Sequence, residues 1–141
     1  MTDKNVSIMN IGSMGYLPQV FKKIENEKRL NIVYLGGSIT MGCNATKTEL
    51  RYVDRSAKWW QTNFPDAEIS YFNAGIGATT SQFGVARVQE HVLDKQPDLV
   101  FVEFSVNDSS LPLFMETYES LVRRLLKAES VKAVVLINNL F

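Results

Sequence analysis

The sequence contains a single cysteine and a single histidine, and each scarcity excludes a class of site. Cys43 has no second thiol in the chain with which to form an internal disulfide or a cysteine-based zinc site. Lysine plus arginine number 15, as do aspartate plus glutamate, so the formal net charge is zero. Nucleic acids and anionic membrane surfaces usually select a basic surplus, so we expect neither as a partner.

Long hydrophobic runs are also missing. The apolar runs stay well short of the ~20 residues that cross a bilayer. No long apolar core follows the first residues, Met1 to Asn5, so we expect neither a membrane span nor a signal peptide. We therefore expect a cytoplasmic location. Hydrophobic residues make up 45% and charged residues 21% of the chain, which is typical of one globular domain over residues 1–141.

Short apolar runs alternate along the chain with segments of helical period. This alternation is typical of a parallel sheet with helices on both faces. Continuous apolar runs predict buried strands, and apolar residues spaced three and four apart predict helices. We expect strands near residues 32–35, 69–72, 98–104 and 133–137, and helices near residues 17–24, 53–64, 80–93 and 114–125.

Ligand sites of such sheets lie beyond the carboxyl ends of the strands. Three polar turns, two of them rich in glycine, are expected there, at residues 36–42, 73–81 and 105–110. The first turn matches neither the dinucleotide fingerprint, nor the phosphate-binding loop, nor the nucleophile elbow, which disfavours nucleotide binding. What remains is Ser38 on a tight turn, with a hydroxyl that either projects into the crevice or caps a following helix.

The second and third turns each allow a chemical and a structural interpretation. Glycines in the second turn let backbone N–H groups approach a ligand beside the positive end of a helix, which suits a developing oxyanion. The same glycines are also common in strand-to-helix loops without chemical roles. In the third turn, the amide of Asn107 either points at that oxyanion or, with Asp108, caps the next helix.

Together the three turns resemble the sequence blocks of the SGNH (GDSL-type) hydrolases. Residues 36–40 resemble the first block in a Gly-Gly-Ser-Ile-Thr variant, residues 73–79 the second, and residues 106–108, after Glu103-Phe104, the third. The blocks occur in the family's order, and the resemblance runs from about Asn10 to the end of the chain. It implies a three-layer α/β/α fold with a parallel flavodoxin-like sheet in the order 2-1-3-4, whose fifth strand is missing.

The resemblance also implies an activity, the hydrolysis of carboxylic esters through an acyl-serine intermediate. Ser38 would be the nucleophile, and its own N–H, the N–H of Gly77 and the side chain of Asn107 would form the oxyanion hole. The substrate would be a small acyl ester or an acetylated carbohydrate, because this variant of the first block looks like that of members that remove acetyl groups from carbohydrates. No metal or organic cofactor is needed for such chemistry.

The family's catalytic base is missing from this sequence. An Asp-x-x-His block near the C-terminus normally supplies it, and the chain ends at Phe141 without such a block. His91 lies on the predicted helix 80–93, about 16 Å from the catalytic edge by helix rise, where it cannot reach Ser38. We therefore expect a hydrolase as the full-length protein and little or no activity from this chain. The alternative is a non-catalytic binding or interaction module that keeps the pocket.

Four further expectations concern single elements. Without a fifth strand, residues 133–137 would form an apolar sheet edge, which we expect a second copy or a swapped segment to cover. Cys43 is expected to be buried, Trp60 to lie in the core, and Glu103 to be neutralised by a partner, for which Arg87 is the candidate.

Overall fold

The computed structural model describes residues 12–13, 15–109 and 111–139. The segment from Met1 to Asn5, Ser110 of the third turn and the last two residues lie outside the described residues. The strands are β1 (Arg29–Gly36), β2 (Glu68–Gly75), β3 (Leu99–Glu103) and β4 (Ala133–Leu136). The helices are α1 (Leu17–Glu27), α2 (Ser38–Met41), α3 (Tyr52–Asn63), α4 (Ser81–His91) and α5 (Leu111–Lys127), with short 3-10 turns η1 (Thr48–Leu50) and η2 (Leu93–Lys95).

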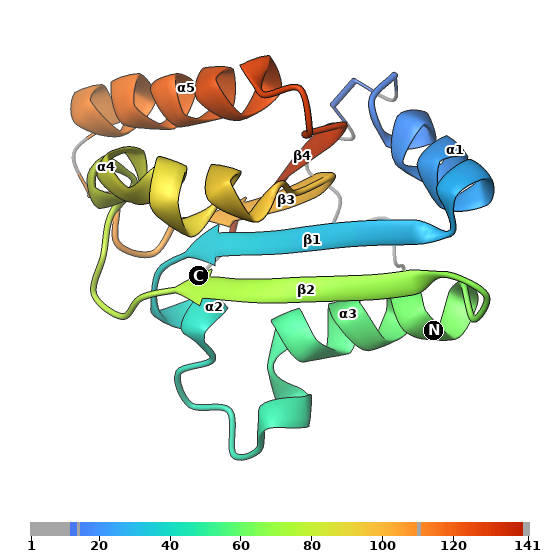
Figure 1. Ribbon diagram of the computed structural model, residues 1–141. Helices are drawn as coiled ribbons and strands as arrows, with labels where there is room; N and C mark the ends of the chain where they lie inside the picture. The colour runs from blue at the N-terminus through green and yellow to red at the C-terminus, as the bar shows by residue number, and fades with distance from the viewer. Residues whose placement is uncertain (1–11, 14, 110, 140–141) are drawn as a thin grey trace.

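The strands form one parallel sheet in the order β2-β1-β3-β4 (Figure 1). This confirms the predicted three-layer α/β fold and strand order. The central strand β1 contains the apolar run of residues 32–35, whose four side chains are all fully buried. A strand covered on both faces needs such a continuous run rather than alternation, which explains why this strand was readable from the sequence.

Helices cover both faces of the sheet and create two hydrophobic clusters. On one face, α4 and α5 lie side by side and pack on β1 and β3 through residues such as Val88, Leu121 and Val102. On the other face, α1 and α3 pack on the same strands through residues such as Ile24, Val53 and Leu99. Trp60 belongs to this second cluster and is buried, as predicted.

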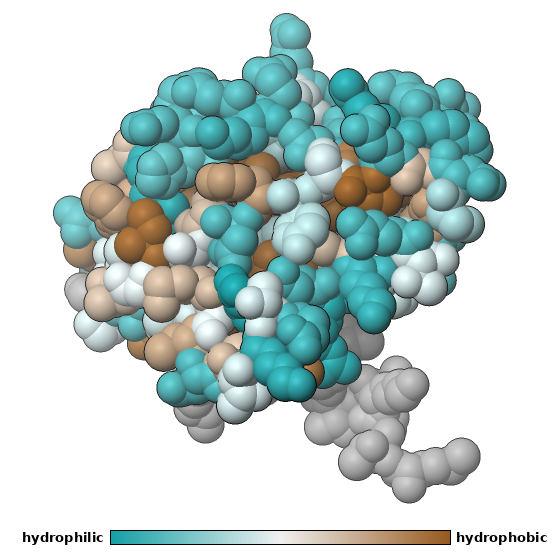
Figure 2. Space-filling model, turned by 60° about the horizontal axis from the view of Figure 1, so that its bottom comes forward, coloured by the Kyte–Doolittle hydropathy of each residue, from teal (hydrophilic) through white to brown (hydrophobic). Residues whose placement is uncertain are grey.

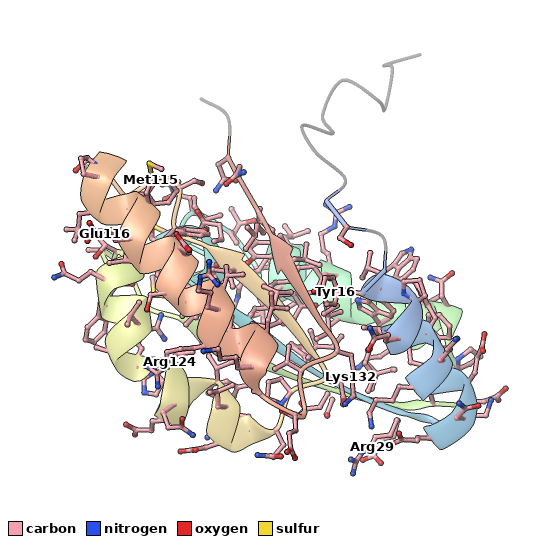
Figure 3. All side chains as sticks on the ribbon, turned by 90° about the horizontal axis from the view of Figure 1, so that it is seen from above. Tyr16, Arg29, Met115, Glu116, Arg124 and Lys132 are labelled. Carbon is pink, nitrogen blue, oxygen red and sulfur yellow. The ribbon has the colours of Figure 1, made fainter. Side chains whose placement is uncertain are left out.

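The two helices of the first face are also joined by a polar contact. Arg124 of α5 extends toward α4 and donates a hydrogen bond of 3.1 Å to the carbonyl of Val85 (Figure 3). Arg124 lies in the last turns of α5, and this bond adds to the apolar packing between the helices. The two helices thus form one layer over this face of the sheet.

The structure differs from the sequence prediction around the first turn. Residues 38–41 form the one-turn helix α2, which ends at Gly42 with a left-handed φ of 97°. A helix of four residues has too few positions to show a hydrophobic period, so the sequence did not reveal it. Cys43 follows Gly42 and is exposed, so its predicted burial was wrong.

The surface combines polar and apolar areas. The face that carries α3 is mostly hydrophilic, with separate hydrophobic patches between the polar side chains (Figure 2). Among the described residues, no helix combines the length and hydrophobicity that crossing a membrane requires. β2 and β4 are the two edge strands of the sheet, as the predicted order requires.

Candidate active site

The three predicted turns begin at one edge of the sheet because the strands before them end in register. Gly36, at the end of β1, is paired with Gly75 of β2 and with Glu103 of β3. The turn after β1 then bonds back to β3, through the N–H of Gly37 and the carbonyl of Glu103 at 3.2 Å. The turn after β2 bonds to β1, through the N–H of Ile76 and the carbonyl of Gly36 at 3.0 Å.

Ser38 is the first residue of α2, and its hydroxyl is not used to cap that helix. The N-cap position belongs to Gly37, which has no side chain to offer. The carbonyl of Ser38 accepts hydrogen bonds from Gly42 and Cys43, but its hydroxyl bonds to none of the described residues. The capping interpretation of Ser38 is therefore wrong, and the half-buried hydroxyl is free to meet a ligand.

Asn107 is joined to the second turn rather than to the helix that follows it. Its Nδ2 donates a hydrogen bond of 2.9 Å to the carbonyl of Thr79. A Cβ atom at Gly37 would lie 2.8 Å from the same Nδ2, so the amide rests directly against the residue that precedes Ser38. An amide has two N–H groups, so one remains for a ligand beside Ser38 after the bond to Thr79.

Asp108 also contacts the second turn. Its Oδ1 accepts the N–H of Ser81, the first residue of α4, at 3.0 Å. Thr80, the N-cap of α4, provides no side-chain hydrogen bond, so Asp108 caps α4 from a different loop. Its Oδ2 is buried and has no partner among the described residues. Asn107 and Asp108 thus hold the third turn against the segment between Thr79 and Ser81.

The second turn closes tightly over α2. A Cβ at Gly75 would overlap the backbone nitrogen of Met41, so only glycine allows this approach. The side chain of Asn73 donates to the carbonyl of Thr40 at 2.8 Å and accepts the N–H of Gly75 at 2.9 Å. The first and second turns therefore form one packed unit.

Gly77 lies in the same unit, and the residue after it is strained. A Cβ at Gly77 would lie 3.3 Å from the methyl carbon of Met41, which follows Ser38 by three positions. Ala78 has a left-handed φ of 57°, a conformation that is uncommon for alanine and costs about 1 kcal/mol or more. Strain of this kind is often found at functional sites, where the surrounding structure imposes it.

A small pocket of about 90 Å³ borders Asn107. The N-terminal parts of α4 and α5 and the third turn form its walls, with Ser81, Asp108, Phe114 and Thr117 among the lining residues. The pocket combines apolar and polar walls and is large enough for a group of a few heavy atoms.

Arg87 is buried beneath the first two turns. It donates from Nη1 to the carbonyl of Ala74 at 2.7 Å and from Nη2 to the carbonyl of Gly36 at 3.0 Å. Burial lowers the pKa of its guanidinium, which nevertheless stays charged at neutral pH. The sequence suggested Arg87 only as a partner for Glu103, because a hydrogen bond to a backbone carbonyl cannot be recognised from the residue types.

Glu103 does not pair with Arg87, and that prediction was wrong. The carboxylate of Glu103 accepts hydrogen bonds from Asn139 at 2.9 Å and from the hydroxyl of Ser105 at 3.3 Å. Ser105 in turn accepts the backbone N–H of Asn139 at 3.0 Å. These bonds attach the segment after β4 to the end of β3.

His91 is the last residue of α4, and its Nδ1 lies 3.2 Å from Nη1 of Arg87. Among the described residues, no hydrogen bond joins the imidazole to Ser38. In the same part of the chain, no group of three or more His, Cys, Asp or Glu residues lies close enough together to hold a metal ion.

Buried hydroxyl groups join α2 and β1 to the helix α3. Thr40 and Tyr52 share a hydrogen bond of 2.9 Å, and Tyr34 donates to the hydroxyl of Ser56 at 2.8 Å. Burial raises the pKa of Tyr34 to about 12 and raises the pKa of Tyr52 still further. Both phenols therefore remain neutral at physiological pH and act as hydrogen-bonding supports.

Comparison with solved structures finds agreement over nearly the whole chain. A two-domain esterase active on acetylated mannans, co-crystallised with mannopentaose, matches 97% of this chain with 47% sequence identity and a TM-score of 0.92. A catalytic mutant of an acetylxylan esterase from Geobacillus stearothermophilus matches 76% of this chain with 26% identity and a TM-score of 0.60. The chain spans 38% of the first of these proteins and 58% of the second.

Sequence comparison identifies a relative with lower identity than the mannan esterase, and it also identifies a family. The uncharacterised lipoprotein YqeF of Bacillus subtilis (strain 168) is 28% identical over an alignment of 102 positions, and the match covers 60% of this chain and 42% of that protein. The model of the GDSL-like lipase/acylhydrolase family matches residues 34–141, a range that includes all three turns. The chain therefore belongs to the GDSL-like lipase/acylhydrolase family, as its three sequence blocks indicated.

Proposed function

We propose that the intact protein is a serine esterase that removes acetyl groups from carbohydrates, and that Ser38 is its nucleophile. Two observations support this proposal: the hydroxyl of Ser38 bonds to none of the described residues, and the Asn107 amide lies against Gly37, the residue before Ser38. The Ser38 oxygen attacks the acyl carbonyl, the alcohol of the sugar leaves, and water then releases acetate from the acyl-serine. The two solved esterases named above act on acetylated mannans and on acetylated xylan, which supports this substrate class.

The oxyanion of the tetrahedral intermediate is stabilised by three donors in this proposal. They are the N–H of Ser38, the N–H of Gly77 and the side-chain amide of Asn107. Removal of one such donor typically lowers kcat by roughly 10²- to 10³-fold.

A serine hydroxyl also needs a base, and residues 1–141 offer one histidine, which is engaged with Arg87. We therefore propose that residues 1–141 alone release acetate slowly or not at all. Without a catalytic base, residues 1–141 keep the pocket and act at most as a binding module.

The test compares acetate release from acetylated manno-oligosaccharides by three proteins. These are the product of the complete reading frame, its Ser38→Ala variant and residues 1–141 alone. We expect turnover only from the first, and a Ser38→Ala variant that retains full activity would refute the proposal. Strong turnover by residues 1–141 that is lost in His91→Ala would instead show that His91 is the base.

A further inference from the structure

Arg87 is a buried cation whose hydrogen bonds lead to the ends of β1 and β2. The residue is only 6% exposed, and among the described residues it has no carboxylate partner. A buried charge costs free energy unless polar groups satisfy it. Two backbone carbonyls, those of Gly36 and Ala74, and the ring nitrogen of His91 meet its two terminal nitrogens, while its Nε has no partner among the described residues.

The two carbonyls belong to the peptide groups that open the first and second turns. The carbonyl of Gly36 shares a planar peptide group with the N–H of Gly37, the residue before Ser38. The carbonyl of Ala74 shares one with the N–H of Gly75, two residues before Gly77. Because a peptide group is planar, a donor that fixes the oxygen also fixes the direction of the N–H on the other side.

The Gly36 carbonyl also connects the two turns to each other. It accepts the N–H of Ile76 at 3.0 Å as well as Nη2 of Arg87 at 3.0 Å. Ile76 directly precedes Gly77, so one oxygen atom joins the cation, the start of the first turn and the middle of the second. The guanidinium therefore lies at the point where the backbones that carry the Ser38 and Gly77 N–H groups meet.

We propose that Arg87 is a positioning residue that sets the relative placement of the Ser38 and Gly77 N–H groups. The inference rests on the proposed function, since it assigns Arg87 to the same oxyanion hole. A guanidinium is suited to this task because its N–H donors lie in a rigid plane and reach two carbonyls at once. A lysine ammonium is a compact, strongly hydrated charge that does not reproduce this fork.

The first test uses residues 1–141 and needs no catalysis. Amide ¹H–¹⁵N spectra are recorded for Arg87→Met, Arg87→Lys and the control His91→Ala, which removes an Arg87 partner but leaves both carbonyl bonds. We expect both Arg87 variants to shift the amide signals of Gly37, Ser38, Gly75 and Gly77. The signals of Leu30 and Ile32, at the far end of β1, should stay in place. The control should leave the four turn signals near their original positions.

The second test uses the product of the complete reading frame. Arg87→Met should lower kcat per titrated active site by roughly 10- to 100-fold, the scale of a misplaced catalytic group, with KM changed by less than about threefold. A residue that only stabilises the fold would lower the yield of active sites and leave kcat per site unchanged. Arg87→Lys should recover only part of kcat, and His91→Ala should retain nearly all of it.

The outcomes separate this inference from the proposed function. If Ser38→Ala is inactive while Arg87→Met or Arg87→Lys keeps the original kcat and turn signals, the role of Arg87 is refuted and the esterase proposal stands. If Ser38→Ala stays active, the esterase proposal fails, and with it the assignment of Arg87 to an oxyanion hole. If Arg87→Met does not fold, Arg87→Lys decides by the same two measurements.

Discussion

Gly37 and Asn107 are in a contact that any side chain at position 37 would disturb. A Cβ at Gly37 would lie 2.8 Å from Nδ2 of Asn107 and 3.3 Å from the carbonyl of Thr79. Those two groups are themselves hydrogen-bonded at 2.9 Å. The missing side chain at position 37 thus allows the amide of Asn107 to lie directly against the residue before Ser38, a placement that the proposed mechanism needs.

We predict that Gly37→Ala disturbs catalysis more than folding. The added methyl group displaces the Asn107 amide, so kcat of the intact protein should fall by roughly 10- to 1000-fold, up to the full loss of one oxyanion donor. Acetate release measured at saturating substrate tests this expectation. Gly15→Ala is the matched control, because a Cβ at Gly15 meets only the hydroxyl of Ser13, at 3.5 Å. An unchanged kcat in Gly37→Ala would contradict the placement of Asn107 in the site.

Asp108 provides a second prediction, which concerns stability. Asp108→Ala removes the acceptor that caps α4 at Ser81, so it should lower the free energy of unfolding by about 1 kcal/mol. Asp108→Asn keeps an oxygen acceptor at the same place and should lose less than half as much. Urea unfolding followed by circular dichroism compares the two variants. If Asp108→Ala and Asp108→Asn lost equal free energies of unfolding, the charge of Asp108, and not its capping hydrogen bond, would be what stabilises the fold.

The sequence predicted the elements that follow from periodicity and composition. The apolar runs located β1 and β3, and the polar turns after the strands located Ser38, Gly77 and Asn107. The roles of these three residues stay predictions until the variants are measured. Their proximity depends on strands pairing in register, which the repeated β-α pattern implies.

The pairing of Arg87 with Glu103 shows where the sequence argument failed. Val100 and Val102 of β3 pack on the α4–α5 face, so the alternation of a strand turns Glu103 toward the opposite face. Arg87 belongs to α4 and lies on the first face. With α4 placed on the first face, strand alternation excludes the pair, and the true partners of Arg87 are carbonyls that only the folded backbone brings into position.

Tyr34 leads to a prediction about alkaline pH. Burial raises its pKa in the folded state to about 12, against 10.0 for an ordinary tyrosine. A raised pKa contributes stability that is fully present below pH 10 and is lost as the pH rises through 12. Between pH 9 and pH 11, Tyr34 should therefore account for a loss of about 1 kcal/mol in the free energy of unfolding.

The measurement is urea unfolding of residues 1–141 and of Tyr34→Phe at both pH values. Tyr34→Phe should be less stable at pH 9, because it loses the hydrogen bond to Ser56, but it should lose less stability on going to pH 11. Tyr16→Phe, at a side chain that is 45% exposed, is the control and should keep the pH dependence of the original chain. Equal losses in Tyr34→Phe and the original chain would contradict the prediction.

The edge strand β4 provides the last prediction. Leu136 at its end is 47% exposed, and it lines a hydrophobic groove of about 470 Å³ together with Val122 and Leu126 of α5. An unpaired strand beside an apolar groove is a template for association with another chain. Residues 1–141 alone should therefore form dimers or larger species in which this edge is covered by a second copy or a swapped segment.

Sedimentation velocity at several concentrations measures this association. Leu136→Lys places a charge on the edge, which natural sheets use to prevent strand pairing, and should shift the chain to monomers. Leu50→Lys changes a leucine that is equally exposed, at 50%, on η1 rather than on the sheet edge, and should leave the association unchanged. A monomer at all concentrations in the original chain, or equal effects of both lysines, would show that the β4 edge does not drive association. The contrast between the two variants matters more than either alone, because it separates pairing at the sheet edge from a general gain in solubility.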